Sequence, residues 1–164
     1  MEVPPALKDV QSALLKYSHS DQWVKGNSDT VPSLLAETPG LAARRKMISD
    51  ILPRAALYGD TAVLKSVLAN AVNLERRGPY HATALMLAAG RGLPDRVELL
   101  LKADANPHAV DEFGRGALIF GSGSGNAKVV RLLLAAGLRG DAKDKYGDTA
   151  VSYTHLTLPT IYSV

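Results

Sequence analysis

The segment of this sequence that comes nearest to a ligand-binding motif is an apolar run followed by alternating glycines, Ala117–Lys128. An apolar strand, a glycine loop and a helix form the phosphate-binding turn of nucleotide-binding proteins, because backbone N–H groups at the helix N-terminus hold the anion. The third glycine of the G-x-G-x-x-G pattern would fall at Asn126, and no G-K-[ST] follows. The segment also aligns with Leu85–Arg91, where we expect a helix. We therefore predict neither a nucleotide site nor any other cofactor.

Other catalytic and metal-binding patterns are also missing from the sequence. There is no cysteine, so a thiolate nucleophile and Cys-ligated zinc are excluded. No H-E-x-x-H and no G-x-S-x-G motif occurs. The four histidines have no partner at ligand spacing; they are His19, His81, His108 and His155. We predict no metal site and no enzymatic activity.

Composition and charge describe a packed domain that binds neither nucleic acid nor membrane. The 164 residues are 46% hydrophobic, with a net charge of +3. Basic and acidic residues are mixed, and the aromatic share of 5% provides few stacking platforms for bases. No apolar run approaches the roughly 20 residues of a membrane helix, and no signal peptide is visible. We expect a cytoplasmic protein.

The middle of the chain repeats itself at a constant interval. Three windows begin at Asp50, Thr83 and Gly116, and a fourth opens at Thr149. The aligned positions include Leu52, Leu85 and Leu118; Gly59, Gly92 and Gly125; Leu64, Val97 and Val130; and Val67, Leu100 and Leu133. An ungapped 33-residue period of this kind is typical of repeat architectures.

Each window predicts two helices and a long turn. In the second window a short apolar segment from Leu85 to Ala89 predicts a helix, and Gly92 marks the turn after it. An amphipathic helix follows from Asp95, whose charge suits the helix N-terminus. Asp111–Gly114 predicts a tight turn. One such unit cannot bury a core alone, so we expect an all-α stack of units.

These motifs resemble the ankyrin repeat family over roughly residues 50–151. The T-P-L-H-x-A opening of the family is represented by Thr83–Ala89, and its outer helix by Val97–Leu101 and Val129–Gly137. The long turn matches as Asp111–Gly114 and Asp144–Thr149. The resemblance implies an all-α ankyrin-repeat solenoid that acts as a non-enzymatic protein–protein interaction module.

The sequence departs from the family pattern at three kinds of position. The motif's proline is replaced by Ala84, Ala117 and Ala150, and its histidine by Met86, Ile119 and Ser152. Its paired alanines become Gly121–Ser122 in the third window. We expect weaker helix starts and inter-repeat hydrogen bonds from these changes, with the fold unaltered.

We divide the chain into an N-terminal helical capping region (1–49), repeats at 50–82, 83–115 and 116–148, the start of a fourth repeat at 149, and a tail (152–164). In the first window Asp50 is expected to be the N-cap of a separate helix with Pro53 in its first turn. The alternative is one helix from Pro39 to Tyr58, kinked at Pro53. For the capping region, the alternative is a recognition helix with Trp23 as an exposed anchor.

The tail is expected to be foreign to the array. It has no charged residue, is rich in β-branched residues and contains Pro159, which makes it a poor fit to any helix. It resembles the translated adapter or vector sequence found at the ends of truncated reading frames, and we expect the natural array to continue past about Ala150. The alternative is a native strand-like tail.

The resemblance also implies where a partner would bind, at turn tips and exposed inner-helix positions. Besides Leu57, Pro79, Gly90, Gly123 and Asp148, the candidate residues are Tyr58, Tyr80, Arg91, Glu112, Phe113, Arg115, Ser124, Lys145 and Tyr146. Tyr80, Phe113 and Tyr146 occupy the same position in successive repeats, which predicts an aromatic row along one face. The alternative is that these rings only cover their own turns.

We expect a monomer that binds a protein of unknown identity. Two other functions stay open: the targeting or substrate-recognition fragment of a larger, truncated enzyme or effector, and a spacer in an oligomer.

Overall fold

The computed structural model describes residues 41–58, 61–70 and 72–155 of the chain. These residues contain seven α-helices and no strand, and one isolated bridge pairs Val110 with Gly116. The helices are α3 (Leu41–Tyr58), α4 (Thr61–Leu68), α5 (Ala84–Gly90), α6 (Pro94–Lys102), α7 (Ala117–Gly123), α8 (Ala127–Ala135) and α9 (Ala150–His155), with a 3-10 turn η2 (Pro79–His81). The predicted all-α class is confirmed.

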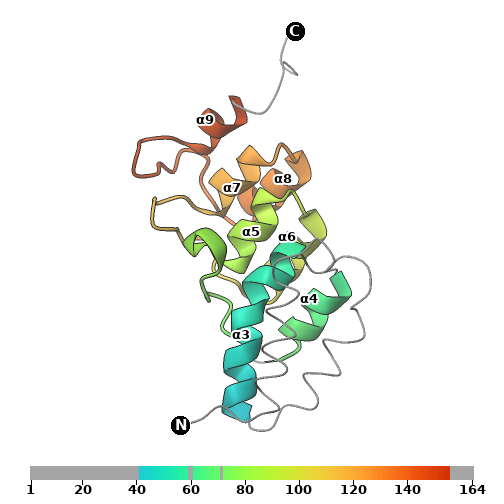
Figure 1. The fold of residues 1–164 in the computed structure, drawn as a ribbon. Helices are drawn as coiled ribbons and strands as arrows, with labels where there is room; N and C mark the ends of the chain where they lie inside the picture. Colours follow the sequence, from blue (N-terminus) through green and yellow to red (C-terminus); the bar gives the residue numbers. More distant parts are fainter. Residues whose placement is uncertain (1–40, 59–60, 71, 156–164) are drawn as a thin grey trace.

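The helices form two layers (Figure 1). The inner layer is the row α3, α5, α7 and α9, in which each helix packs against the next, and the outer layer is α4, α6 and α8. Each outer helix also packs against the inner helix that precedes it in the chain. The long loops before α5, α7 and α9 project to one side of the stack. The chain is therefore a solenoid of helix pairs that recur at the interval predicted from the sequence.

The core lies between the two layers and between successive pairs. Every residue of α5 from Ala84 to Ala89 is buried, because neighbours cover this helix on several sides. The outer helices bury only one stripe, for example Val97 and Leu100 of α6, and Val129 and Leu133 of α8. This is the pattern of an amphipathic helix with one face in solvent.

Two of the helix starts are capped by side chains that the repeat supplies. The Thr83 hydroxyl oxygen accepts a hydrogen bond from the Met86 backbone N–H, at 3.4 Å. The side-chain carbonyl oxygen of Asn126 accepts from Lys128 N at 3.0 Å and from Val129 N at 3.4 Å. Such caps satisfy N–H groups that have no partner within the helix.

The glycine-rich segment is helical, as its alignment with Leu85–Arg91 predicted. It forms α7, in which the Ser122 hydroxyl donates to the Leu118 carbonyl oxygen, at 2.8 Å. Gly121 lies against α8, since a Cβ atom there would stand 3.0 Å from both Leu133 Cδ1 and Val129 Cγ1. Glycine thus replaces the first of the motif's paired alanines at a position where the inner helix α7 and the outer helix α8 lie close together.

The expectation of a separate helix starting at Asp50 is wrong. Helix α3 is continuous through Pro53, as in the single-helix alternative, although a proline inside a helix removes one backbone hydrogen bond. Pro53 is buried and lies directly against the backbone of Gly78, so packing offsets that loss. Asp50 does not cap a helix; it forms an ion pair with Arg76 at 2.6 Å. The predicted boundary between residues 49 and 50 therefore falls inside a helix.

The expectation that the sequence after Val151 fits no helix is also wrong, for residues 152–155. Helix α9 continues to His155 and packs against α7 as the inner helix of a fourth unit. The Ser152 hydroxyl oxygen accepts a hydrogen bond from Thr149 N at 3.4 Å. Stacking on α7 outweighs the low helix propensity of this segment.

Several sequence predictions fall on residues that the structure does not describe. Residues 1–40 of the predicted N-terminal capping region, including Trp23, lie outside the described residues. The tail from 156 to 164, including Pro159, lies outside them as well. The foreign origin of the tail stays a prediction.

The contact between Pro53 and Gly78 predicts a costly substitution. A Cβ atom at Gly78 would overlap with the Cβ of Pro53, whose ring cannot move aside within α3. We expect Gly78→Ala to lower the free energy of unfolding by about 1–3 kcal/mol. Chemical denaturation followed by circular dichroism measures the change.

Gly123→Ala is the control, because no heavy atom lies within 4 Å of a Cβ atom built there. This change within α7 should stabilise the protein by about 0.4–1 kcal/mol, since it restricts the unfolded chain. Equal stability of the two variants would contradict the packing account.

Candidate partner-binding surface

The long turn of the second repeat is held by one carboxylate. Asp111 Oδ1 accepts hydrogen bonds from Phe113 N and Arg115 N, both at 2.9 Å. Asp111 N donates to the Arg115 carbonyl oxygen at 3.0 Å, which closes the turn. Gly114 has a φ of +78°, a conformation that glycine adopts without steric cost. These contacts fix the backbone and point the intervening side chains outward.

The next repeat builds the same turn. Asp144 Oδ1 accepts from Tyr146 N at 2.8 Å and from Asp148 N at 2.9 Å, and Asp144 N donates to the Asp148 carbonyl oxygen at 2.9 Å. Gly147 has a φ of +84°. The aligned residues thus adopt one conformation, as the sequence register predicted for a tight turn.

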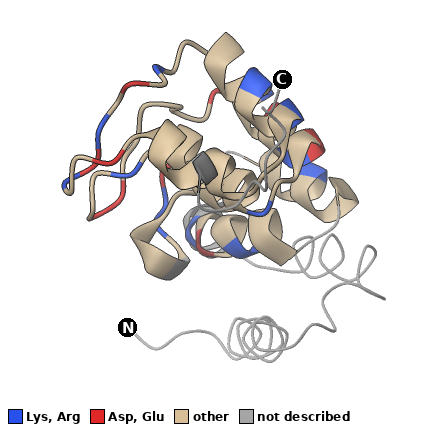
Figure 2. Cartoon of the chain, turned by 90° about the horizontal axis from the view of Figure 1, so that it is seen from above, with Lys and Arg blue, Asp and Glu red and all other residues tan. Residues whose placement is uncertain are grey.

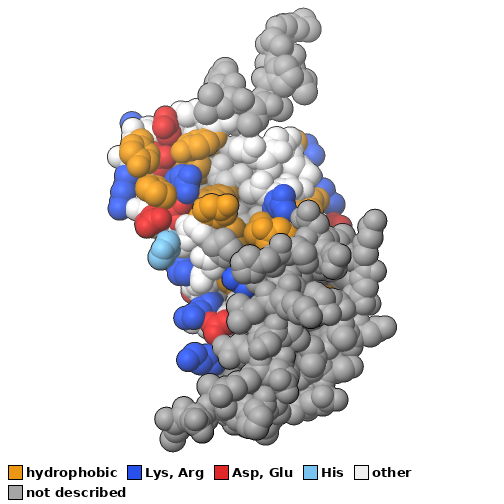
Figure 3. Space-filling model, in the orientation of Figure 1, with side chains coloured by type: hydrophobic (Ala, Val, Ile, Leu, Met, Phe, Trp, Pro, Cys, Tyr) orange, Lys and Arg blue, Asp and Glu red, His pale blue; other side chains and the backbone are white. Residues whose placement is uncertain are grey.

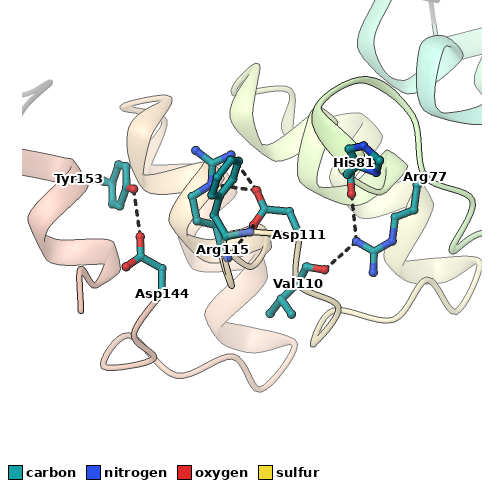
Figure 4. A network of polar contacts seen from close by, with 8 residues as sticks. Arg77, His81, Val110, Asp111, Arg115, Asp144 and Tyr153 are labelled. Carbon is teal, nitrogen blue, oxygen red and sulfur yellow. Dashed lines mark hydrogen bonds and ion pairs between the residues drawn. The ribbon is translucent and has the colours of Figure 1, made fainter. Parts of the chain in front are cut away.

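Neighbouring tips are joined to one another. Lys145 N donates to the Phe113 carbonyl oxygen at 2.9 Å. Arg77 Nη1 donates to the carbonyl oxygens of His81 (3.1 Å) and Val110 (2.7 Å), which connects the first tip to the second (Figure 4). We call residues 77–81, 110–115 and 143–148 the first, second and third tip, and together the tip face. In Figure 3, hydrophobic, basic and acidic side chains lie next to one another at the left of the molecule, where the long loops project in Figure 1.

Two of the three aromatic residues of the predicted row lie side by side. The rings of Phe113 and Tyr146 stack with their centroids 6.3 Å apart, and Tyr146 is 72% exposed. Tyr80 is 74% exposed but forms no ring stacking with a described residue. Its φ is +59° and that of His81 is +52°, left-handed values that are unusual for side chains of this size. The structure therefore brings together two of the three rings.

Arg115 is held within the second tip. Its Nη2 and Nε lie 2.7 and 2.8 Å from Asp111 Oδ2, and its guanidinium carbon lies 4.9 Å from the Phe113 ring centroid and 5.0 Å from that of Phe120. Burial works to lower the pKa of Arg115, but Asp111 and, to a smaller extent, Tyr153 outweigh it, and the pKa is raised. The Arg115 side chain therefore stabilises the second tip as well as forming part of its surface.

The other candidates lie at the ends of inner helices or at exposed tip positions. Arg91 covers the Tyr58 ring, 5.4 Å from its centroid. The Ser124 hydroxyl donates to the Gly121 carbonyl oxygen at 2.6 Å and so belongs to the turn between α7 and α8. Glu112 and Lys145 are exposed and form no ion pair with a described residue.

Sequence reasoning missed two residues of this surface. Phe120 connects the second tip to the inner helices, because it contacts Arg115 and lies 3.1 Å from a Cβ atom built at Gly90. It occupies the same repeat position as Tyr153, and this shared aromatic position was a signal for it. Nothing in the sequence pattern distinguishes Arg77, whose partners are backbone carbonyls.

The pKa of the Asp144 carboxylate in the third tip is lower than its ordinary value. Burial works to raise the pKa of Asp144, but hydrogen bonds from the N–H groups of Asp148 and Tyr146 and from the Tyr153 hydroxyl, together with the positive charge of Arg115, outweigh it. The pKa of Asp144 is therefore lowered. Tyr153 donates to Asp144 Oδ2 at 3.1 Å. Burial and this carboxylate raise the pKa of Tyr153, and they outweigh Arg115, which works to lower it.

The described part of the chain offers neither a metal site nor a membrane span. No three His, Cys, Asp or Glu side chains gather there at a spacing that could hold a metal ion. No helix in this part is long and apolar enough to cross a membrane.

Comparison with known protein families gives one match. A family model described as ankyrin repeats, in three copies, matches residues 52–144. A comparison with curated proteins finds no match.

The lowered pKa of Asp144 predicts how the stability of the tip depends on pH. A group whose pKa is lower in the folded state stabilises it above the ordinary pKa, and loses that effect as pH falls through the folded value. We expect Asp144→Asn to be less stable than the unmodified chain at neutral pH, with a difference that shrinks below about pH 4. Urea denaturation at a series of pH values measures this difference.

The control is Glu112→Gln, which changes an exposed carboxylate on the second tip that holds no turn. Its stability should follow that of the unmodified chain at every pH. A deficit of Asp144→Asn that persists undiminished to about pH 2 would contradict the assignment.

Proposed function

The chain belongs to the ankyrin repeat family, whose members are generally protein–protein interaction modules, and on this premise we propose that it binds a partner protein through the tip face and the adjoining inner-helix surface. Tyr80, Arg91, Phe113 and Tyr146 contribute most of the binding energy. Ankyrin repeats are typically non-catalytic, and we assign no reaction to the chain.

The observation that carries this proposal is the exposure of aromatic rings, two of them on turns whose backbone is held by hydrogen bonds. Tyr80 and Tyr146 are 74% and 72% exposed, and Phe113 stacks beside Tyr146 on turns that carboxylates hold in place. Aromatic side chains are common anchors of protein interfaces. A rigid backbone lowers the entropic cost of binding, because the rings are already positioned.

Charge also favours a protein partner. Basic and acidic residues are mixed along the long loops of the chain (Figure 2). Nucleic-acid binding would require a continuous basic surface. The mixed surface suits a folded protein or peptide with charges of both signs, bound by a monomer in the cytoplasm. A targeting fragment of a larger enzyme or effector would use the same face.

The proposal predicts the effect of removing the three rings. Tyr80→Ala, Phe113→Ala and Tyr146→Ala combined should weaken binding of a partner isolated with the unmodified chain at least about thirtyfold, since hot-spot residues contribute about 2 kcal/mol or more. The partner is identified by pull-down from a lysate, and the dissociation constant is then measured with purified protein.

The matched control carries three alanines on exposed positions of the outer helices: Lys65→Ala, Lys102→Ala and Arg131→Ala. Both variants must retain the helical circular dichroism spectrum. Loss of binding in the outer-helix variant, together with retained binding in the tip variant, would refute the proposed face.

A further inference from the structure

The guanidinium of Arg77 in the first tip is anchored through one of its three nitrogens. Nη1 donates to the carbonyl oxygens of His81 at 3.1 Å and of Val110 at 2.7 Å, which uses both of its N–H groups. No described residue accepts a hydrogen bond from Nε or Nη2, and no described carboxylate lies within ion-pair distance of the side chain. In Figure 4, Nη2 points away from both carbonyl groups. Arg77 is exposed, so this edge of the guanidinium is open to a ligand.

Other arginines of the chain use the same edge to pair with a carboxylate. Arg115 places Nε 2.8 Å and Nη2 2.7 Å from Asp111 Oδ2. Arg139 places Nε 3.0 Å from Asp141 Oδ1 and Nη2 2.7 Å from Asp141 Oδ2. This edge presents two N–H groups in a geometry that matches the two oxygens of a carboxylate. Arg77 holds the same edge in place without a carboxylate.

The first tip contains no acidic residue that could pair with Arg77. Residues 77–81 are Arg-Gly-Pro-Tyr-His, with glycine where the second and third tips have an aspartate. Glu75 Oε1, just before the tip, accepts a hydrogen bond at 2.9 Å from a backbone N–H of the loop after α6. Asp50 pairs with Arg76 at 2.6 Å. The positive charge of Arg77 therefore has no counterion among the described side chains.

The backbone next to Arg77 is held in a conformation that side chains rarely adopt. The φ of Tyr80 is +59° and that of His81 is +52°, and the second and third tips have glycine at the position of His81. The hydrogen bond from Arg77 to the His81 carbonyl helps to hold this turn. Residues in such conformations cluster at binding sites, where surrounding contacts maintain them. The first tip therefore combines a fixed cation with the exposed ring of Tyr80.

We propose that the first tip binds an aspartate or glutamate side chain of the partner protein. The carboxylate pairs with Nε and Nη2 of Arg77, while Nη1 stays on the carbonyl groups of His81 and Val110. Because Nη1 already fixes the guanidinium, less side-chain freedom is lost on binding than for an unanchored arginine. This inference rests on the proposed function, since it names the chemical group of the partner that one tip recognises.

The charge around the first tip favours a carboxylate over a phosphate. Arg77 contributes one positive charge, which one carboxylate neutralises. Glu112 on the neighbouring tip is exposed and forms no ion pair with a described residue. A phosphate, which carries close to two negative charges at neutral pH, is repelled by Glu112 more strongly than a carboxylate is. A phosphorylated residue is therefore the competing ligand.

The test uses two short peptides as probes, acetyl-Gly-Glu-Gly-amide and acetyl-Gly-Gln-Gly-amide. Each is titrated into the ¹⁵N-labelled full chain at constant ionic strength, while the Arg77 Nε–H signal and the backbone amide signals are followed by NMR. We expect the glutamate peptide to shift the Arg77 Nε–H signal saturably. It should bind at least about threefold more tightly than the glutamine peptide, because a hydrogen bond to an ionised acceptor is roughly twice as strong as a neutral one.

Three variants locate the binding group. Arg77→Gln should weaken binding of the glutamate peptide at least about threefold, since the charge is lost. Arg77→Lys keeps the charge and can still donate to a carbonyl of the tip, but it lacks the two-nitrogen edge and should weaken binding about twofold or more. Arg76→Gln is the matched control, because the guanidinium of Arg76 already pairs with Asp50, and it should leave binding within about twofold. All three must retain the helical circular dichroism spectrum.

Equal binding of the two peptides, or an unchanged affinity of Arg77→Gln for the glutamate peptide, would overturn the proposal. Binding of acetyl-Gly-phosphoserine-Gly-amide at the same Arg77 signal, at least about threefold tighter than that of the glutamate peptide, would overturn it in favour of a phosphate ligand.

The inference and the proposed function can fail separately. If the combined Tyr80, Phe113 and Tyr146 variant loses the partner while Arg77→Gln binds it with unchanged affinity, the tip face binds protein without a carboxylate at the first tip, and the inference is wrong. If the glutamate peptide binds at Arg77 but the outer-helix variant loses the partner and the tip variant retains it, the site exists and the proposed function is wrong.

Discussion

The structure depends on one constraint: a helix pair in the described part of the chain cannot bury its apolar side chains without its neighbours. Helix α5 shows this most clearly, because it is buried along its length between α3 and α7. Small residues allow the close approach that such burial needs. A Cβ atom on Gly121 of α7 would stand only 3.0 Å from Leu133 Cδ1 and Val129 Cγ1 of α8, so the close spacing of these two helices depends on the absence of one side chain. The constant repeat interval follows, since each unit must present the same face to the next.

This constraint also sets the geometry of the surface on which function is proposed. The stacked helices fix the separation of successive loops, and Asp111 and Asp144 fix the conformation of two of them. The bond from Lys145 N to the Phe113 carbonyl then ties one loop to the next. Side chains such as Tyr146, which the stack does not need for burial, are left exposed on this surface.

Much of this arrangement could be predicted from the sequence, because it depends on periodicity. The helix pairs follow from apolar positions that recur once in every repeat, and the tight turns from Asp111 and Asp144 with their glycines. Predictions from local sequence preference were wrong where a contact between residues distant in sequence decides whether a segment is helical. Pro53 suggested a helix start, but it packs against Gly78 inside a continuous helix. The uncharged residues after Val151 are poor helix formers, yet stacking on α7 makes them helical up to His155.

The site was predicted less completely, for the same reason. The register placed Phe113 and Tyr146 together correctly, but it could not show that Arg115 contacts Phe120 or that Arg77 bridges two tips. These contacts depend on side-chain directions rather than on spacing.

The helices position the tips, and we propose that the tips bind the partner. Both parts of this arrangement can be followed by hydrogen–deuterium exchange of the chain, measured with and without its partner. We expect slower exchange on binding for amides of residues 77–81, 110–115 and 143–148, with no change in the outer helices α4, α6 and α8. Protection of the outer helices with unchanged exchange at the tips would contradict it.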